Sequence, residues 1–386
     1  MISSYSSRSG GAGERRPGEK TIRSEELEMS QTGKRRRKNP PLGRVIVIDV
    51  LIGALILALY MFIKFALPIL SAQPVVYTPA PEPTPAAVEE TAPVTPEPAA
   101  ETPAPAEETP EPTPDTRTEW QKRFAEHFTE EVAVTDHSYT SSEVSINIET
   151  RTLQASRGET VVHIADIYVA SLDNFKTATA NNELKYFSVD DVMNIDAASN
   201  AILAISGDLY AYQPSGLLMR NGVLYRNDPT GCDVCVLYAD GVLATYRRGS
   251  VDNEAILAAQ PLQIWNFGPA LLDENGQAYP SFQVSTAVGY PNPRSAVGYY
   301  EPGHYCFVVV DGRQEGYSAG LLIPELAQLF QELGCTSAYN LDGGGSAVMT
   351  FLHEKYSRQS NGADRDLSDI LLITEAGFGA QKEGEA

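Results

Sequence analysis

The run Asp342-Gly343-Gly344-Gly345-Ser346, which follows a short apolar strand, is the part of the sequence whose residue types point most directly to chemistry. Three adjacent glycines cost conformational entropy unless the backbone must adopt positive φ or approach another group closely. The N–H groups of such a turn form a concave site for an anion, phosphate above all, and the serine could add a hydroxyl donor. The alternative is a tight turn capped by the aspartate.

His163 is the histidine whose surroundings best suit chemistry. An imidazole pKa lies near neutrality, so this side chain could act as acid or base if it pointed into a cleft. It stands in the apolar run 161–165, however, where a core position is the alternative.

Cysteine and histidine spacing does not favour a metal site. Cys232 and Cys235 form one close pair, whereas Cys306 and Cys335 are isolated, and a four-thiolate zinc site needs two close pairs. The first pair could form a surface disulfide, and we expect the isolated cysteines to be buried as small hydrophobic residues. The five histidines form no tight H-x-D or H-x-x-H pattern. We therefore expect no catalytic metal, although aspartate and backbone oxygens could hold a structural Ca²⁺.

Several short elements follow one another within about residues 160–375: AISGD at 204–208, RNGVLY at 220–225, NPRSAVG at 292–298, HYCFVVVDGR at 304–313, AYNLDGGGSAVM at 338–349, and the closing pair Asn361 and RDLSD at 365–369. These elements and their order resemble those of the phosphodiester glycosidase family. The sequence departs from the family at Ser206, where asparagine is usual.

The resemblance implies hydrolysis of the glycosidic bond of a sugar-1-phosphate diester, with release of the free sugar and no required cofactor. Asp342 and Asp208 are then the carboxylate candidates, one as nucleophile or general base and the other as an orienter or sugar ligand; carboxylates stabilise the oxocarbenium character of the transition state. Arg294 and Arg365 offer planar donor forks for phosphate oxygens, although either could be a salt-bridge residue. The glycines 343–345, Ser346 and Asn361 complete the implied substrate site, and His163 is a further catalytic candidate.

Two other functions stay open. A non-catalytic glycan-binding or exopolysaccharide-assembly module would have scattered charges and an aromatic sugar platform. A metal-dependent phosphodiesterase would cluster histidine and aspartate at ligand distance.

The elements that must position these residues are mostly strands. Alternating or continuous β-branched runs appear at 144–148 and 161–170, and Asn221-Gly222 and Asp240-Gly241 each separate two apolar runs, which is typical of primed-turn hairpins. Ser188 could cap one helix, and Pro324 could open another that Gly334 ends. Residues 119–386 are therefore expected to form an α+β domain with a mixed, largely antiparallel sheet and a few helices.

The chain before this domain has a different composition. Residues 1–44 read as a basic, disordered cytoplasmic tail, and residues 45–67 as an apolar transmembrane helix placed by the positive-inside rule. Residues 68–118, rich in proline, glutamate, threonine and alanine, predict a disordered linker. A cleaved signal peptide is the alternative for the apolar run. We expect a single-pass membrane protein whose extracellular domain acts on surface glycans, and the net charge of −21 argues against nucleic acid as a partner.

Overall fold

The computed structural model describes residues 75–76, 115–360 and 365–378. The basic tail, the apolar run 45–67, most of the linker and Asn361 therefore lie outside the described residues. Within the described ranges, no helix is both long enough and apolar enough to cross a membrane.

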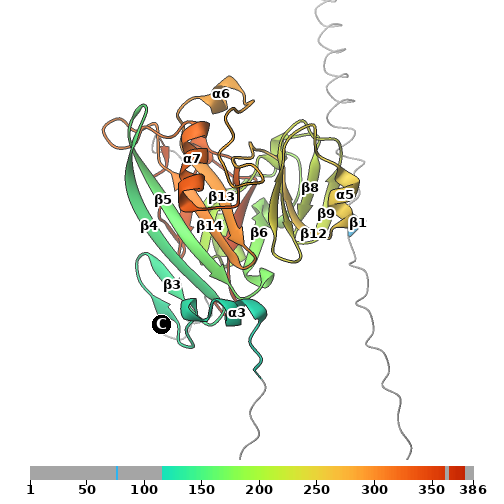
Figure 1. The fold of residues 1–386 in the computed structure, drawn as a ribbon, viewed down its shortest axis with the longest axis vertical. Helices are drawn as coiled ribbons and strands as arrows, with labels where there is room; N and C mark the ends of the chain where they lie inside the picture. Colours follow the sequence, from blue (N-terminus) through green and yellow to red (C-terminus); the bar gives the residue numbers. More distant parts are fainter. Residues whose placement is uncertain (1–74, 77–114, 361–364, 379–386) are drawn as a thin grey trace, which may run out of the picture. The chain divides into compact units, whose positions relative to one another are not determined.

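A seven-stranded antiparallel sheet forms the largest element of the domain (Figure 1). The long hairpin of β4 (Val144–Ala155) and β5 (Gly158–Val169) lies next to β14 (His304–Val310). Strand β5, which contains the β-branched run at 161–170, is therefore paired on both edges and has β-branched side chains on both faces. The strand order is β15 (Ser337–Asn340), β13 (Arg294–Glu301), β14 (His304–Val310), β5 (Gly158–Val169), β4 (Val144–Ala155), β3 (Ser138–Thr140) and β2 (Ala133–Val134).

Two further antiparallel sheets complete the fold. In the five-stranded sheet, the order is β17 (Glu354–Lys355), β16 (Met349–Phe351), β7 (Leu203–Ser206), β18 (Asp369–Ile373) and β6 (Phe175–Thr179). In the six-stranded sheet, the order is β1 (Val75–Val76), β9 (Val223–Asn227), β8 (Leu217–Arg220), β12 (Pro261–Trp265), β10 (Val234–Tyr238) and β11 (Leu243–Tyr246). The prediction of an α+β domain with largely antiparallel sheets is confirmed.

One apolar core joins the three sheets. Phe175 packs at their junction, with its ring centroid 5.5 Å from that of Phe307 in the seven-stranded sheet and 6.2 Å from that of Trp265 in the six-stranded sheet. All three side chains are at most 1% exposed. Burial of aromatic surface on this scale is the main favourable term for holding separate sheets together.

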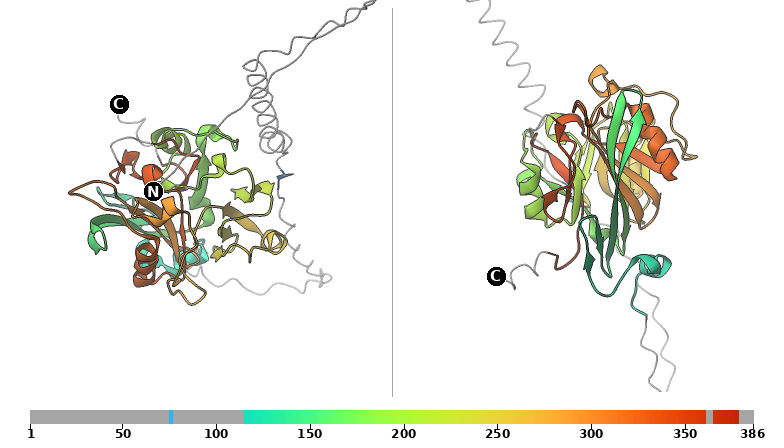
Figure 2. Two further views of the ribbon diagram at one scale, coloured as in Figure 1. Left: turned by 90° about the horizontal axis from the view of Figure 1, so that it is seen from above. Right: turned by 90° about the vertical axis from the view of Figure 1, so that its left-hand side faces the viewer.

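Helix α7 (Ile323–Leu333) packs on the opposite face of the seven-stranded sheet, as Figure 1 and the side view in Figure 2 show. Pro324 stands in its first turn and Gly334, with φ of 83°, ends it, which confirms the prediction from the sequence. At Gly298 on β13, a Cβ atom would lie 2.7 Å from the ring of Phe330. The glycine therefore permits the close approach of helix and sheet.

The remaining helices are short: α3 (Glu119–Arg123), α4 (Val192–Ser199), α5 (Asn253–Ala258) and α6 (Thr286–Gly289). The prediction of Ser188 as a cap is wrong, because Asp191 caps α4 by accepting a hydrogen bond from the N–H of Met193. The carboxylate of Asp191, a residue in extended conformation, thus binds one of the free N–H groups in the first turn of the helix.

The two predicted hairpins differ in their turns. Asn221 and Gly222 both have positive φ and directly join β8 to β9, so this primed turn is confirmed. The hairpin at Asp240-Gly241 is present, but β10 and β11 pair at Leu237 and Leu243, and only the glycine has positive φ. The loop is thus longer than the two residues predicted.

Candidate functional site

The ends of three strands are joined where the main sequence motifs meet. The N–H of Asp342 donates to the carbonyl of Gly207 at 2.9 Å, and Ser206 Oγ donates to the carbonyl of Asp342 at 3.0 Å. Ser295 Oγ in turn donates to the carbonyl of Ser206 at 3.0 Å. The residue that replaces the family's usual asparagine, Ser206, therefore fixes the position of the candidate carboxylate.

Asp342 is a buried carboxylate with an exposed cationic partner. It is 6% exposed, and its Oδ2 accepts a hydrogen bond from Nη2 of Arg365 at 2.7 Å. Arg365, whose side chain is 51% exposed, also donates from Nε to Ser346 Oγ at 2.7 Å. Burial raises the pKa of Asp342, and Arg365 and Ser346 partly oppose that rise. The structure thus brings together three predicted site residues.

The glycine turn beside Asp342 contains main-chain N–H groups that have no recorded hydrogen-bond partner within the described ranges. Gly344 has φ of 65°, and its N–H donates to the carbonyl of Pro293 at 2.9 Å. A Cβ atom on Gly343 would lie 2.7 Å from that same carbonyl oxygen, so no larger residue fits there. The hydrogen bonds recorded between described residues use the N–H groups of Gly344 and Ser346, but not those of Gly343 and Gly345. These two donors remain for an anion.

A second arginine, which the sequence analysis did not select, lies against this turn. The guanidinium of Arg313 would be 3.0 Å from a Cβ atom on Gly344, and its Nε and Nη2 both donate to Asn292 Oδ1, at 3.1 and 2.5 Å. Arg313 ends the HYCFVVVDGR element, has a positive φ of 59° and is exposed. Its place at the end of a matching motif was the available signal. Arg313 and Arg365 flank the glycines.

Arg294 has different surroundings from those expected. It is 3% exposed; its Nε donates to the carbonyl of Leu321 at 3.0 Å, and its Nη2 to the carbonyls of Val288 and Tyr290, each at 2.8 Å. Burial lowers the pKa of Arg294 to about 10. These bonds hold main-chain loops together, so Nε and Nη2 of the planar fork that suggested a phosphate contact are already engaged.

Asp208 lies in a fully buried ion cluster. Its Oδ1 accepts from the N–H of Tyr210 at 3.0 Å, its Oδ2 accepts from the N–H of Asn266 at 2.9 Å, and Nη2 of Arg220 lies 2.9 Å from Oδ2. Arg220 Nη2 is also 2.7 Å from Asp369 Oδ2, and Asp369 Oδ1 accepts from the N–H of Asp208 at 3.0 Å. Burial raises the pKa of Asp369 to about 7, with Arg220 acting in the opposite direction. Both oxygens of Asp208 are therefore committed.

The cluster also gives a structural role to charged residues of two motifs. Arg220 opens RNGVLY and Asp369 closes RDLSD, and both residues serve to hold Asp208. Sequence alone could not have separated them from surface charges, because their pairing depends on contact between residues about 150 positions apart.

His163 lies within the core, as one of its two interpretations had it. It is 5% exposed; Nδ1 is 3.0 Å from Thr150 Oγ1 and Nε2 is 3.2 Å from Asp311 Oδ2. Asp311 also accepts from Tyr317 OH at 2.8 Å and from the N–H of Arg358 at 3.1 Å. The recorded contacts connect His163 to the loop that carries Arg313 and include none with Asp342 or Asp208.

The four cysteines are free thiols in the structure. Cys306 and Cys335 are buried, as predicted, with their sulfur atoms 3.6 Å apart. Within the described part of the chain, no group of three or more His, Cys, Asp or Glu side chains could hold a metal ion. The structural Ca²⁺ site considered from the sequence stays a prediction.

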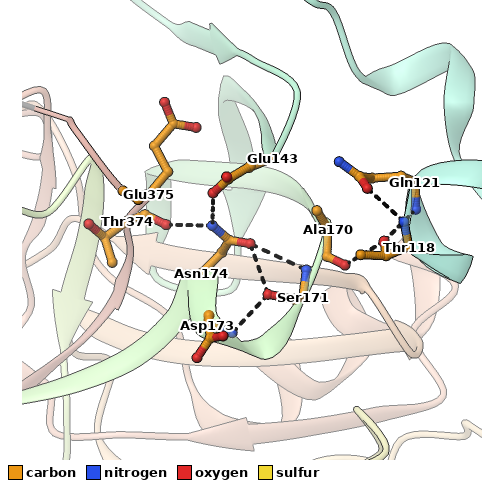
Figure 3. Close-up of a pocket in the computed structure, with 10 residues that line it drawn as sticks. Thr118, Gln121, Glu143, Ala170, Ser171, Asp173, Asn174, Thr374 and Glu375 are labelled. Carbon is orange, nitrogen blue, oxygen red and sulfur yellow. Dashed lines mark hydrogen bonds between the residues drawn. The ribbon is translucent and has the colours of Figure 1, made fainter. Parts of the chain in front are cut away.

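A cavity of about 610 Å³ lies apart from these residues (Figure 3). Glu143, Asp173 and Glu375 contribute carboxylates to its lining. Asn174 already bonds to Glu143 and to the carbonyl of Thr374, as Figure 3 shows. Three acids without an arginine or lysine in the lining would repel a phosphodiester, so we do not place the substrate site in this cavity.

A smaller cavity of about 230 Å³ adjoins the residues that hold Asp208. Gln213 lines it and accepts a hydrogen bond from Asn266 Nδ2 at 3.3 Å, and Asn266 is the residue whose N–H binds Asp208. Arg248 adds a cation to the same lining. This cavity is large enough for one small polar group of a substrate.

Comparisons with known proteins agree with the motifs. The family model for phosphodiester glycosidases matches residues 199–374. A curated relative, the SPbeta prophage-derived uncharacterized protein YomE of Bacillus subtilis (strain 168), is 28% identical over 192 residues, which are 48% of this chain and 30% of that protein. The chain thus matches less than a third of this relative's length.

A solved structure shares the fold. The catalytic domain of zebrafish N-acetylglucosamine-1-phosphodiester alpha-N-acetylglucosaminidase, auto-inhibited by its pro-peptide, superposes with a TM-score of 0.51 at 20% identity, covering 64% of this chain and 88% of that one. The resemblance seen in the sequence is therefore confirmed: residues 199–374 match the model of the phosphodiester glycosidase family, and the fold is that of the zebrafish catalytic domain.

Proposed function

We propose that this domain hydrolyses the glycosidic bond of a sugar-1-phosphate diester, with Asp342 as the reacting carboxylate. The observation that carries the proposal is the glycine turn flanked by Arg313 and Arg365 directly beside Asp342. It offers an anion site and a carboxylate at one place, and the family match supports a glycosidase-type reaction.

The anion site suits a diester because the rest of the molecule is acidic. A net charge of −21 repels a phosphate-bearing substrate at long range. Two guanidinium groups and the unused N–H groups of Gly343 and Gly345 supply local positive potential at short range, where screening matters least. Arg294, whose Nε and Nη2 donate to main-chain carbonyls, is not assigned to this site.

The chemistry requires few protein groups. As the bond between the anomeric carbon and the phosphate oxygen breaks, its electron pair leaves with a phosphomonoester, and an oxygen from water completes the free sugar. Asp342 stabilises the positive charge at the anomeric carbon, either by attacking it or by removing the proton of the attacking water. A phosphomonoester leaves readily, so a general acid that protonates the leaving group, such as His163, is not required.

Asp208 then acts as an orienter. Both of its oxygens are occupied, and the adjoining Gly207 accepts the hydrogen bond of the Asp342 N–H. We further propose, from the sequence alone, that an N-terminal helix anchors the protein in the cell membrane with this domain outside, and that phosphodiester-linked surface glycans are the substrate class.

The test is product identity from a synthetic N-acetylglucosamine-1-phosphodiester with the full-length protein. We expect free sugar, release that survives EDTA, and a loss of at least about a thousandfold in Asp342→Asn, the scale seen when a covalent or general-base group is removed. Asp136→Asn, at an aspartate whose side chain is 92% exposed, is the matched control and should keep full activity.

Two results would contradict the proposal. Sugar-1-phosphate as the product, lost in EDTA, would indicate a metal-dependent phosphodiesterase. No product from a folded protein with any sugar-1-phosphodiester, together with glycan binding, would indicate a non-catalytic module.

A further inference from the structure

Tyr186, Phe187 and Tyr212 form an aromatic cluster at the surface, here called the aromatic platform, in which Tyr186 is half-buried. Phe187 is 62% exposed and Tyr212 is 46% exposed. The ring centroid of Phe187 lies 4.1 Å from that of Tyr186 and 5.4 Å from that of Tyr212. Aromatic rings that lie together and are largely open to water mark a place where a ligand packs.

The backbone of the platform is strained. Phe187 has φ of 61°, a conformation that a bulky residue rarely adopts. It is held there by a hydrogen bond from its N–H to the carbonyl of Ala211 at 2.9 Å, and by Ser188 N–H to the carbonyl of Lys185 at 3.2 Å. Such strain persists only where the surrounding structure imposes it, and strained residues cluster at sites that bind ligands. Here it presents the phenylalanine ring to solvent.

The platform lies close along the chain to the candidate active site. Tyr212 ends the short 3₁₀ helix 210–212, whose first N–H binds Asp208. Gly207, which holds Asp342, is five residues before Tyr212, so the chain between them spans at most about 18 Å. The next residue after Tyr212, Gln213, lines the 230 Å³ cavity. This separation is short enough for one polymeric ligand to contact both Asp342 and the platform.

The neighbours of the platform favour a sugar over a lipid or a polyanion. Glu183 and Lys185 are both exposed and form an ion pair at 2.6 Å, so the local charge is balanced. Asn181 is also exposed and supplies amide groups. A pyranose ring has C–H faces that pack on aromatic rings and hydroxyls that bond to such polar groups, whereas a membrane surface or a polyanion would favour clustered cations.

We propose that Tyr186, Phe187 and Tyr212 form a glycan-binding subsite that holds neutral sugar residues of a polymeric substrate, some distance from the bond that is cleaved. The choice of that bond rests on the proposed function; glycan binding by the platform does not. The subsite would make the enzyme prefer a phosphodiester carried by a glycan chain over a small soluble diester.

The experiment measures binding of chitohexaose, cellohexaose and maltohexaose to the full-length protein by titration calorimetry. We expect saturable binding of at least one of these neutral hexasaccharides. The double variant Phe187→Ala/Tyr212→Ala should bind it about tenfold to a hundredfold more weakly, since each aromatic contact is worth about 0.5–1.5 kcal/mol. Phe187→Tyr and Tyr212→Phe, which keep the rings, should bind as the parent does.

Two further variants separate binding from folding. Phe187→Gly removes the ring and relieves the strain at positive φ, so it should keep or raise the unfolding temperature while weakening binding. Val134→Ala, at an apolar residue that is 51% exposed on β2, is the control and should leave binding unchanged.

Absence of binding to all three hexasaccharides overturns the proposal, and so does equal binding by the double alanine variant. Hydrolysis of a small synthetic diester should be unaffected by the double variant. Glycan binding that depends on the rings in a protein without hydrolytic activity would uphold the subsite and reject the proposed function. Hydrolysis of the small diester without glycan binding would uphold the proposed function and reject the subsite.

Discussion

Asp342 and Asp208 are both buried aspartates that follow short strands, yet they occupy opposite electrostatic settings. Asp208 has both oxygens filled by main-chain N–H groups and Arg220, and shares that arginine with Asp369. Asp342 is paired through one oxygen to an arginine whose side chain is 51% exposed. A carboxylate whose oxygens are all bonded within the fold stabilises that fold, whereas a carboxylate with spare acceptor capacity beside an exposed arginine is free to act on a ligand.

The same contrast separates the arginines. Arg294 gives three recorded hydrogen bonds to carbonyls, while Arg313 bonds to the side chain of Asn292 and remains exposed beside Gly344. Motif membership does not distinguish these two residues. The number of donors that the fold has already used does.

The largest expected effect is on the saturated site. Arg220→Met should lower the free energy of unfolding by about 3–5 kcal/mol, because two buried carboxylates would lose their shared cation. Urea denaturation at pH 7 measures this. Arg358→Met, at an exposed arginine that lies over the ring of Tyr317, should change it by less than about 0.5 kcal/mol. Equal effects for the two variants would show that the buried carboxylates Asp208 and Asp369 do not depend on Arg220 for their stability.

The second prediction concerns the two arginines of the NPRSAVG and HYCFVVVDGR elements. Arg313→Met should lower kcat/KM for a sugar-1-phosphodiester by roughly tenfold to a hundredfold, the value of one or two hydrogen bonds to a charged group, with little change in stability. Arg294→Met should instead lower the free energy of unfolding with little change in kcat/KM, because three main-chain carbonyls would lose donors. A larger activity loss in Arg294→Met, at equal stability, would return the phosphate contact to Arg294.

The third prediction uses pH. Burial raises the pKa of Asp369 to about 7, above its unfolded value of 3.8. Between about pH 4 and 7 the folded state then binds more protons than the unfolded state, so this group makes stability fall as pH rises, by at most about 1.4 kcal/mol per pH unit. Asp369→Asn should flatten that part of the stability profile relative to the parent protein, as measured by urea denaturation at pH 5, 6 and 7.

Activity should follow the opposite trend. Asp342 must be ionised to act, and burial raises its pKa. The rate should therefore fall as pH drops through that raised pKa, whereas acidification makes the contribution of the Asp369 carboxyl to stability more favourable. A rate that declines together with stability on acidification would mean that unfolding, and not protonation of Asp342, limits activity.

Much of this arrangement was accessible from the sequence, and the reasons for the rest are physical. Alternation at Val144, the Asn221-Gly222 turn and the Pro324 helix are local signals, and the structure confirms each. The placing together of Asp342, Arg365 and Ser346 followed from family motifs. The role of Arg313 could not follow, because it depends on which donors of each arginine the fold occupies, and that is decided by contacts across sheets.

The smallest expected effect separates backbone strain from the anion site. Gly344 and Gly334 both have positive φ, 65° and 83°, so an alanine at either position should cost about 1 kcal/mol of stability. Only at Gly344 would the new Cβ meet a neighbour, the guanidinium of Arg313 at 3.0 Å; nothing lies within 4 Å at Gly334. Because a flexible side chain can move away, Gly344→Ala should destabilise no more than Gly334→Ala but lower kcat/KM several-fold by displacing Arg313. Matched denaturation and kinetic measurements on the two variants check this, and equal activity in both would show that Arg313 does not contact the substrate.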